Sequence, residues 1–223
     1  MIEINEIFSD SDKRVALWCE DVGDTNDLAT MADYIIKSDV HFISVPFEIV
    51  PLIWVYLEKF KVQIYTRFDV SLNQKNIDAD IYNLAANITS VCKKGADGIQ
   101  LFVSQHDFES LVDKILPVRD DLFFGHDLSI ALDIEDIDIN NWGTLFQKLR
   151  DLRIKALVLT LNEDMKHRSD FVGRVYGMLQ NWDIDCELHF ILNNNFDRMD
   201  QVIRLVETEK PELSDKLYFF LDY

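Results

Sequence analysis

Eight short apolar runs recur along this chain of 223 residues, and a longer amphipathic stretch separates each run from the next. The runs are nearly continuous in apolar residues, which is typical of parallel strands that are covered on both faces. We therefore expect strands at residues 15–19, 42–45, 63–68, 98–104, 129–134, 156–161, 187–192 and 217–221. No linker rich in Gly or Ser and no low-complexity tract divides them, so we expect one domain over residues 1–223.

The stretches between these runs have the periodicity of helices. Residues 26–37 place Leu28, Met31 and Ile35 on one stripe, as a helix packed against a sheet requires. A second helix is expected at 79–94, and Gly95 just past its end can adopt the left-handed conformation that often terminates a helix. Strands that alternate with helices predict parallel units with crossover connections.

Right-handed crossovers leave two arrangements, a closed barrel or an open doubly wound sheet. The first strand is followed by Glu-Asp-Val-Gly-Asp-Thr at 20–25, which lacks the GxGxxG spacing of a dinucleotide-binding turn. We therefore predict a single (β/α)₈ barrel of the TIM type. The last strand is expected at 217–221, so the barrel would lack its final helix. A second copy could cover the bare side, and a homodimer is therefore one expected partner.

The charge balance excludes two classes of partner. The chain has 22 basic and 40 acidic residues and a formal net charge of −18, which repels nucleic acids and anionic membranes. Its longest apolar run, at 49–57, is too short to cross a bilayer, and its polar N-terminus does not resemble a signal peptide. Three widely spaced cysteines form no CxxC pair. We expect a cytoplasmic protein.

Catalytic groups of such barrels lie at the carboxyl ends of the strands. The acid–base candidates there are Glu135, His189 and Asp133. The candidates for binding a substrate are Arg67, Gln100, Thr160, Asn162, Lys166 and Arg168. No HxH, HExxH or DxDxDG spacing is present, so neither a metal nor another cofactor is expected.

Each of these candidates has a structural alternative. Strand alternation places Asp133 and Glu135 on one face, where they could form an ion pair with Arg67 or include a carboxyl of raised pKa. A single histidine in a strand, such as His189, is more often a hydrogen-bonded core residue than a catalyst. The basic residues at 166–168 could bind a small anionic metabolite, or they could offset the surrounding acids.

Three segments resemble the 2-deoxyribose-5-phosphate aldolase family. They are Ile-Ser-Val-Pro-Phe-Glu-Ile-Val-Pro-Leu at 43–52, Lys-Gly-Ala-Asp-Gly-Ile-Gln at 94–100 and Leu-Asp-Ile-Glu at 132–135. The resemblance covers roughly residues 39–161 and implies an aldolase barrel that acts through a Schiff-base lysine. Members of that family place this lysine on the sixth strand.

The functional positions of that family differ here. Thr160 matches the Schiff-base lysine, Gln100 matches an aspartate of the fourth strand, and Ala131 matches a lysine of the fifth. Threonine cannot form an imine. The sequence therefore leaves open whether the chain is an enzyme. One hypothesis is a divergent aldolase-like barrel without lysine chemistry, inactive or used for small-molecule or protein binding. The other is a lyase or isomerase that acts on a phosphorylated or carboxylated metabolite through Glu135 and His189.

Overall fold

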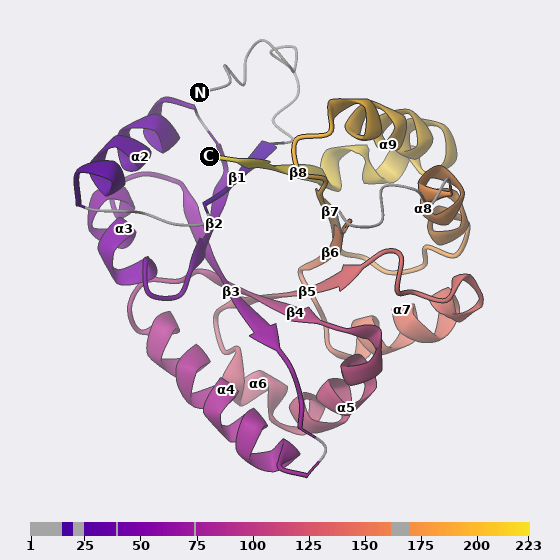
Figure 1. Ribbon diagram of the computed structural model, residues 1–223, viewed down its shortest axis with the longest axis horizontal. Coiled ribbons are helices and arrows are strands. Elements are labelled where there is room, and N and C mark those ends of the chain that lie inside the picture. Colours follow the sequence, from indigo (N-terminus) through magenta and orange to yellow (C-terminus); the bar gives the residue numbers. More distant parts are fainter. Residues whose placement is uncertain (1–14, 20–24, 39, 74, 162–169) are drawn as a thin grey trace.

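The computed structural model describes residues 15–19, 25–38, 40–73, 75–161 and 170–223. Within these ranges eight parallel strands pair in chain order, and the last pairs with the first, so the sheet closes into a barrel (Figure 1). Helices surround this barrel on the outside. The predicted (β/α)₈ fold is confirmed.

All eight predicted strands are present, and their ends lie within two residues of the predicted ones. They are β1 (Val15–Trp18), β2 (Phe42–Pro46), β3 (Gln63–Val70), β4 (Gly98–Val103), β5 (Asp127–Asp133), β6 (Ala156–Thr160), β7 (Glu187–Ile191) and β8 (Leu217–Asp222). The α-helices are α2 (Thr25–Lys37), α3 (Val50–Leu57), α4 (Ile77–Cys92), α5 (Gln105–Ile115), α6 (Arg119–Leu122), α7 (Trp142–Asp151), α8 (Phe171–Gln180) and α9 (Phe196–Glu209). Short 3₁₀ turns are η1 (Leu116–Val118), η2 (Ile139–Asn141) and η4 (Pro211–Lys216). None of the described helices is long and apolar enough to cross a membrane.

The apolar residues form two separate layers because successive strand residues point to opposite faces of the sheet. The larger layer lies between the strands and the helices. The smaller layer fills the barrel interior, and its buried members are Ala16, Phe42, Tyr65, Ala131, Val158, Ile191 and Phe220. A buried polar set accompanies this inner layer, and it includes Ser44, Gln100, Ser129 and His189.

The pairing of β8 with β1 closes the barrel without a described helix after β8. The expectation that this side would be bare is wrong. The outward residues Leu17, Phe219 and Leu221 are at most 2% exposed. They belong to the same apolar layer as residues of α2 and α9, which lie on either side of the β1–β8 pair (Figure 1). This side of the barrel therefore gives no reason for a dimer.

Gly95 follows α4 with a φ of +110°, as its place in the sequence predicted. A second constraint acts at the same residue. A Cβ atom on Gly95 would lie 2.2 Å from the ring of Trp54, so only glycine allows this contact. The ring of Trp54 thus packs α3 against the loop that precedes β4.

Candidate functional site

The three positions singled out by the aldolase resemblance hold unreactive side chains. Gln100 is completely buried, and its Oε1 accepts a hydrogen bond of 2.6 Å from the hydroxyl of Ser44. Ala131 lies in the inner apolar layer. Thr160 ends β6 with its Oγ1 3.5 Å from the carbonyl oxygen of Leu132, which is a long and weak hydrogen bond. None of the three supplies an amine.

Three aromatic rings pack together in the carboxyl-terminal half of the barrel interior. Trp18 packs edge-on against Phe102 and Phe220, with ring centroids 5.5 and 5.8 Å apart. We call these three residues the aromatic floor. The guanidinium carbon of Arg67 lies 3.9 Å from the centroid of Trp18, and its Nη2 donates a hydrogen bond of 2.8 Å to the carbonyl of Cys19. The expected pairing of Arg67 with Asp133 stays a prediction.

The cysteine beside this floor is not a nucleophile at neutral pH. Burial raises the pKa of the Cys19 thiol to about 12, although the charge of Arg67 acts in the opposite direction. A thiol that stays protonated reacts slowly, because the thiolate is the nucleophilic form. Cysteine chemistry therefore does not replace the missing amine.

The chain turns immediately after Asp133, which ends β5. The carboxylate of Asp133 accepts a hydrogen bond of 2.8 Å from the backbone N–H of Glu135. Glu135 thus lies in a turn, and the prediction that it shares a strand face with Asp133 is wrong. Its side chain is nevertheless buried, and within the described residues its Oε2 has no hydrogen-bond partner. Arg174 of α8 holds the turn by donating to the carbonyls of Ile134 and Ile137 at 3.3 and 3.0 Å.

His189 faces the opposite end of the barrel. Its Nε2 is 3.0 Å from Oε2 of Glu187, the first residue of β7. Its ring stacks on Phe42, the first residue of β2, with centroids 5.0 Å apart, and it meets Tyr218 edge-on at 5.1 Å. Glu135 follows the carboxyl end of β5, so the structure does not bring the expected acid–base pair together.

The protonation states at this amino-terminal end follow from burial and hydrogen bonding. Burial lowers the pKa of His189, and the opposing effect of Glu187 is smaller. Burial alone would raise the pKa of Glu187, but hydrogen bonds from His189 and Lys155 outweigh it and lower that pKa. At neutral pH Glu187 is therefore a carboxylate that accepts from a neutral imidazole and from the Lys155 ammonium, whose Nζ is 2.8 Å away.

A second polar contact reinforces this end. The hydroxyl of Tyr65 donates a hydrogen bond of 2.8 Å to Oδ2 of Asp127, the first residue of β5. Burial raises the pKa of Tyr65, and the negative charge of Asp127 raises it further. The phenol thus stays protonated and keeps its donor role.

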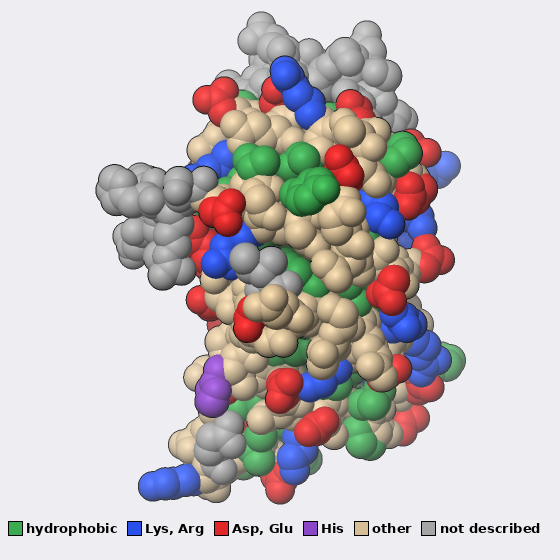
Figure 2. All heavy atoms as spheres, turned by 90° about the vertical axis from the view of Figure 1, so that its right-hand side faces the viewer, with side chains coloured by type: hydrophobic (Ala, Val, Ile, Leu, Met, Phe, Trp, Pro, Cys, Tyr) green, Lys and Arg blue, Asp and Glu red, His purple; other side chains and the backbone are tan. Residues whose placement is uncertain are grey.

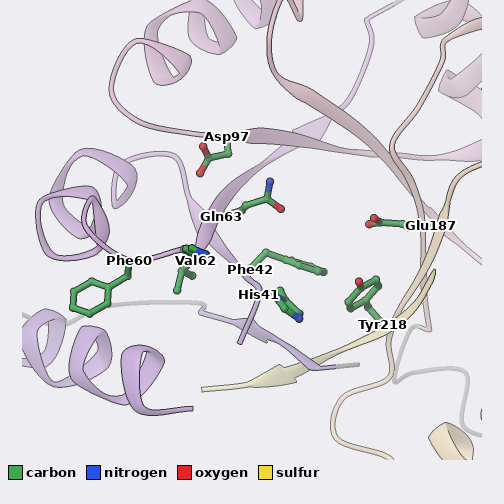
Figure 3. A pocket seen from close by; sticks show the side chains of 9 residues that line it. His41, Phe42, Phe60, Val62, Gln63, Asp97, Glu187 and Tyr218 are labelled. Atoms are coloured by element: carbon green, nitrogen blue, oxygen red, sulfur yellow. The ribbon is translucent and has the colours of Figure 1, made fainter. Parts of the chain in front are cut away.

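A cavity of about 600 Å³ opens beside these groups at the amino-terminal end of the barrel. Its lining residues are His41, Phe42, Phe60, Lys61, Val62, Gln63, Asp97, Glu187 and Tyr218. Figure 3 shows Asp97 and Glu187 on two sides of the cavity, with the Phe42 ring between them. The size is that of a small-molecule site, and the lining combines aromatic rings with a few polar groups.

One feature of the sequence indicates this cluster. Glu187 and His189 are two residues apart in a strand, so they share a face, and both are polar in an apolar run. Lys155 just before β6 and Asp127 at the start of β5 are further polar residues near strand beginnings. Of these four residues only His189 was predicted as a site residue, because catalytic groups of this fold are expected at the carboxyl ends of the strands.

Three of the predicted binding residues, Asn162, Lys166 and Arg168, lie outside the described residues. Among the described residues, no group of three or more His, Cys, Asp or Glu side chains is arranged to hold a metal ion.

Comparison with known proteins gives the fold and nothing finer. No protein-family model and no curated protein matches the sequence. Solved structures do match. An aldolase named QR15 is 9% identical with a TM-score of 0.67, and the match covers 96% of this chain and 92% of that one. The likeness establishes the fold.

Two further structures have the same architecture. The deoxyribose phosphate aldolase from Aeropyrum pernix is 11% identical with a TM-score of 0.61, covering 84% of this chain and 81% of that one. A provisionally assigned copper homeostasis protein CutC from Streptococcus agalactiae is 9% identical with a TM-score of 0.67, covering 93% and 97%. Aldolases and a protein named for copper homeostasis thus share one fold with this chain. The function of the chain therefore has to be argued from the chain's own residues.

Proposed function

We propose that this chain is an aldolase-like barrel that does not act through a Schiff-base lysine and that serves as a binding protein. The observation that carries the proposal is the set of side chains at the aldolase positions. Thr160, Ala131 and Gln100 lie on three neighbouring strands and none can form an imine. The aromatic floor packs at the level of Ala131, because Phe102 is the residue of β4 that pairs with it.

The placement of Lys155 supports the same proposal. A Schiff-base lysine needs a desolvated amine of lowered pKa. The ammonium of Lys155 is bonded to Glu187, which raises its pKa, and it lies at the amino-terminal end of the barrel. The cysteines Cys19, Cys92 and Cys186 are free thiols, which suits a reducing compartment such as the cytoplasm.

Borohydride trapping tests the absence of lysine chemistry. The chain is incubated with acetaldehyde or glyceraldehyde and sodium borohydride, and the intact mass is measured. We expect no rapidly formed single adduct. The matched variant Thr160→Lys restores an amine at the family's position and is expected to give one adduct per chain. An equally fast single adduct on the unchanged protein would contradict the proposal, and Lys166→Arg would show whether Lys166 forms it.

We further propose that a ligand binds at the carboxyl end of the barrel, beside Arg67. Arg67 at the carboxyl end favours a phosphorylated or carboxylated metabolite, whereas Asp97 and Glu187 disfavour anions in the cavity. Ligand-observed NMR with such metabolites should give signals that Arg67→Met abolishes and Arg67→Lys retains. In Gln63→Trp the new ring would occupy the cavity at the amino-terminal end. Loss of the signals in this variant instead would show that the ligand binds in that cavity.

A second candidate function rests on one observation, the buried Oε2 of Glu135, which has no hydrogen-bond partner in the part of the chain that the structure describes. A carboxylate in this situation can accept a proton from a bound carbonyl compound, the first step of many lyase and isomerase reactions. Deuterium exchange into small phosphorylated or carboxylated carbonyl compounds, followed by NMR, measures this step directly. Exchange that persists in Glu135→Gln would exclude the residue, and Glu212→Gln in η4, which is exposed, provides a control outside the site.

A further inference from the structure

The exposed side of α3 is unusually apolar for a surface helix. Leu52, Val55 and Tyr56 are 49%, 62% and 41% exposed, and the helix contains no charged residue between Val50 and Leu57. Exposed apolar side chains are common singly, but a contiguous group on one helix marks an interaction site. The helix lies on the outer rim of the barrel, beside α2 (Figure 1).

These residues form a stripe that is bounded by opposite charges. Glu48, Leu52, Val55, Tyr56 and Lys59 are spaced by four, three, one and three residues, which is the spacing of one helical face. Glu48 precedes the helix by two residues and Lys59 follows it by two, and both are exposed. We call this set the α3 stripe.

The opposite side of the molecule also exposes apolar side chains, such as Val172 and Tyr176 of α8, but charged side chains lie among them. Figure 2 shows acidic and basic side chains distributed between apolar ones over the face that carries α7, α8 and α9. Two copies with a net charge of −18 repel each other wherever such faces meet. The uncharged centre of the α3 stripe is a surface on which like-charged chains can approach closely.

We propose that two copies of this chain form a homodimer in which their α3 stripes pack antiparallel about a two-fold axis. An isologous interface requires a self-complementary surface. The α3 stripe meets this requirement, because an antiparallel arrangement sets Glu48 of one copy against Lys59 of the partner subunit and the reverse at the other end. Phe47 and Phe60, which are 43% and 46% exposed, extend the apolar surface beyond the helix at each end.

The position of α3 is fixed before any partner binds. Trp54 lies against Gly95, and Ile53 and Leu57 are buried in the outer apolar layer. A helix that is already held rigidly loses little conformational entropy on association. The stripe therefore needs no rearrangement to dock.

Light scattering coupled to size exclusion tests the dimer with a matched pair of variants. We expect twice the chain mass of 26.1 kDa for the unchanged protein. Val55→Glu buries a charge in each half of the interface and should raise the dissociation constant about 100-fold or more. Val172→Glu makes the same change at a valine that is 42% exposed on α8, and this variant should remain dimeric. Circular dichroism shows that both are folded.

A charge cycle tests the antiparallel geometry. Glu48→Lys and Lys59→Glu should each weaken the dimer about 3- to 10-fold, because each places like charges together at both ends. The double variant restores both pairs and should regain the original affinity. A monomer at about 100 µM chain, where a micromolar dimer would be saturated, overturns the proposal. Equal weakening by Val172→Glu, or a double variant weaker than both singles, overturns the interface.

Discussion

The two ends of this barrel differ in the kind of side chain that points inward. The carboxyl end, where enzymes of this fold keep their catalytic groups, carries the aromatic floor with the guanidinium of Arg67 stacked on Trp18, together with Thr160 and Ala131. The amino-terminal end holds Glu187 and His189, bonded to each other in the interior. The comparison teaches that ionisable groups inside a barrel can serve packing rather than catalysis, since here their hydrogen bonds are mainly to one another.

The largest expected effect is the loss of stability on removing an aromatic ring, and it should differ between the two ends of the barrel. Phe42→Ala should lower the free energy of unfolding by about 3–5 kcal/mol, because the buried ring contacts Tyr65, His189 and Tyr218. Trp18→Ala at the other end removes a ring that is only partly buried and should cost about 1–2 kcal/mol less. Urea unfolding measures both. Equal costs would show that the two ends do not differ in this respect.

A smaller effect is expected from the carboxylate at the amino-terminal end. Glu187→Ala should cost about 2–3 kcal/mol, because it leaves the N–H of buried His189 without an acceptor and removes the partner of Lys155. Lys155→Ala should cost less, about 1 kcal/mol, since the side chain of Lys155 is 43% exposed. Thermal unfolding of both variants at pH 7 checks the order, and the reverse order would assign the stabilisation to the surface ion pair.

The same end should give the protein a dependence on pH. The pKa of His189 is lowered in the folded state, so below the usual value of about 6.5 the unfolded chain binds more protons and the folded state loses stability. The loss should grow as the pH falls and be at most about 2 kcal/mol at pH 5, the limit for an imidazole that stays neutral in the folded state. The lowered pKa of Glu187 adds a further loss only at more acidic pH, as the carboxylate is protonated.

His189→Gln isolates this contribution in urea titrations at pH 7 and pH 5. The amide can still donate to Glu187 but does not titrate, so the variant should lose less stability than the unchanged protein over this interval. His41→Gln makes the same exchange at an exposed histidine and serves as the control. Identical pH dependence in all three proteins would mean that burial of His189 does not set it.

The smallest effect is expected at the carboxyl end. Thr160→Val removes a hydroxyl whose one hydrogen bond within the described residues is long, and should change the free energy of unfolding by less than about 0.5 kcal/mol. A destabilisation above about 1 kcal/mol would indicate a structural role for this hydroxyl.

The fold could be predicted from the sequence because strand identity depends on local pattern. Runs such as Ala156–Thr160 are apolar up to their last residue, and their alternation with helices limits the topology. The position of each side chain along the barrel axis could not be predicted in the same way. Alternation places Glu135 and His189 on inward faces, but it does not reveal that β5 ends at Asp133 or that the His189 ring turns toward Glu187.

The missed features have two physical causes. The contact of Tyr65 with Asp127 and that of Trp54 with Gly95 join residues far apart in the chain. The turn at Glu135 and the contact of His189 with Glu187 are local, but they depend on where a strand ends and how a side chain turns, which an alternation pattern does not contain. The α3 stripe likewise could not be predicted, because the sequence does not tell which apolar residues of a helix are exposed. Its apolar run reads as a core helix until burial distinguishes Ile53 from Val55.

The closure of the sheet by β1 and β8 has a consequence for association between chains. Val15 and Phe219 are paired although about two hundred residues separate them, so this contact carries the largest loop-closure cost in the barrel. If the pair separates, two edge strands appear together, and both consist mainly of apolar residues. Unprotected edges of this kind pair with strands of other chains. Aggregation on heating or in mild denaturant is therefore expected to begin at this junction, and a disulfide across it should delay aggregation more than one placed elsewhere in the sheet.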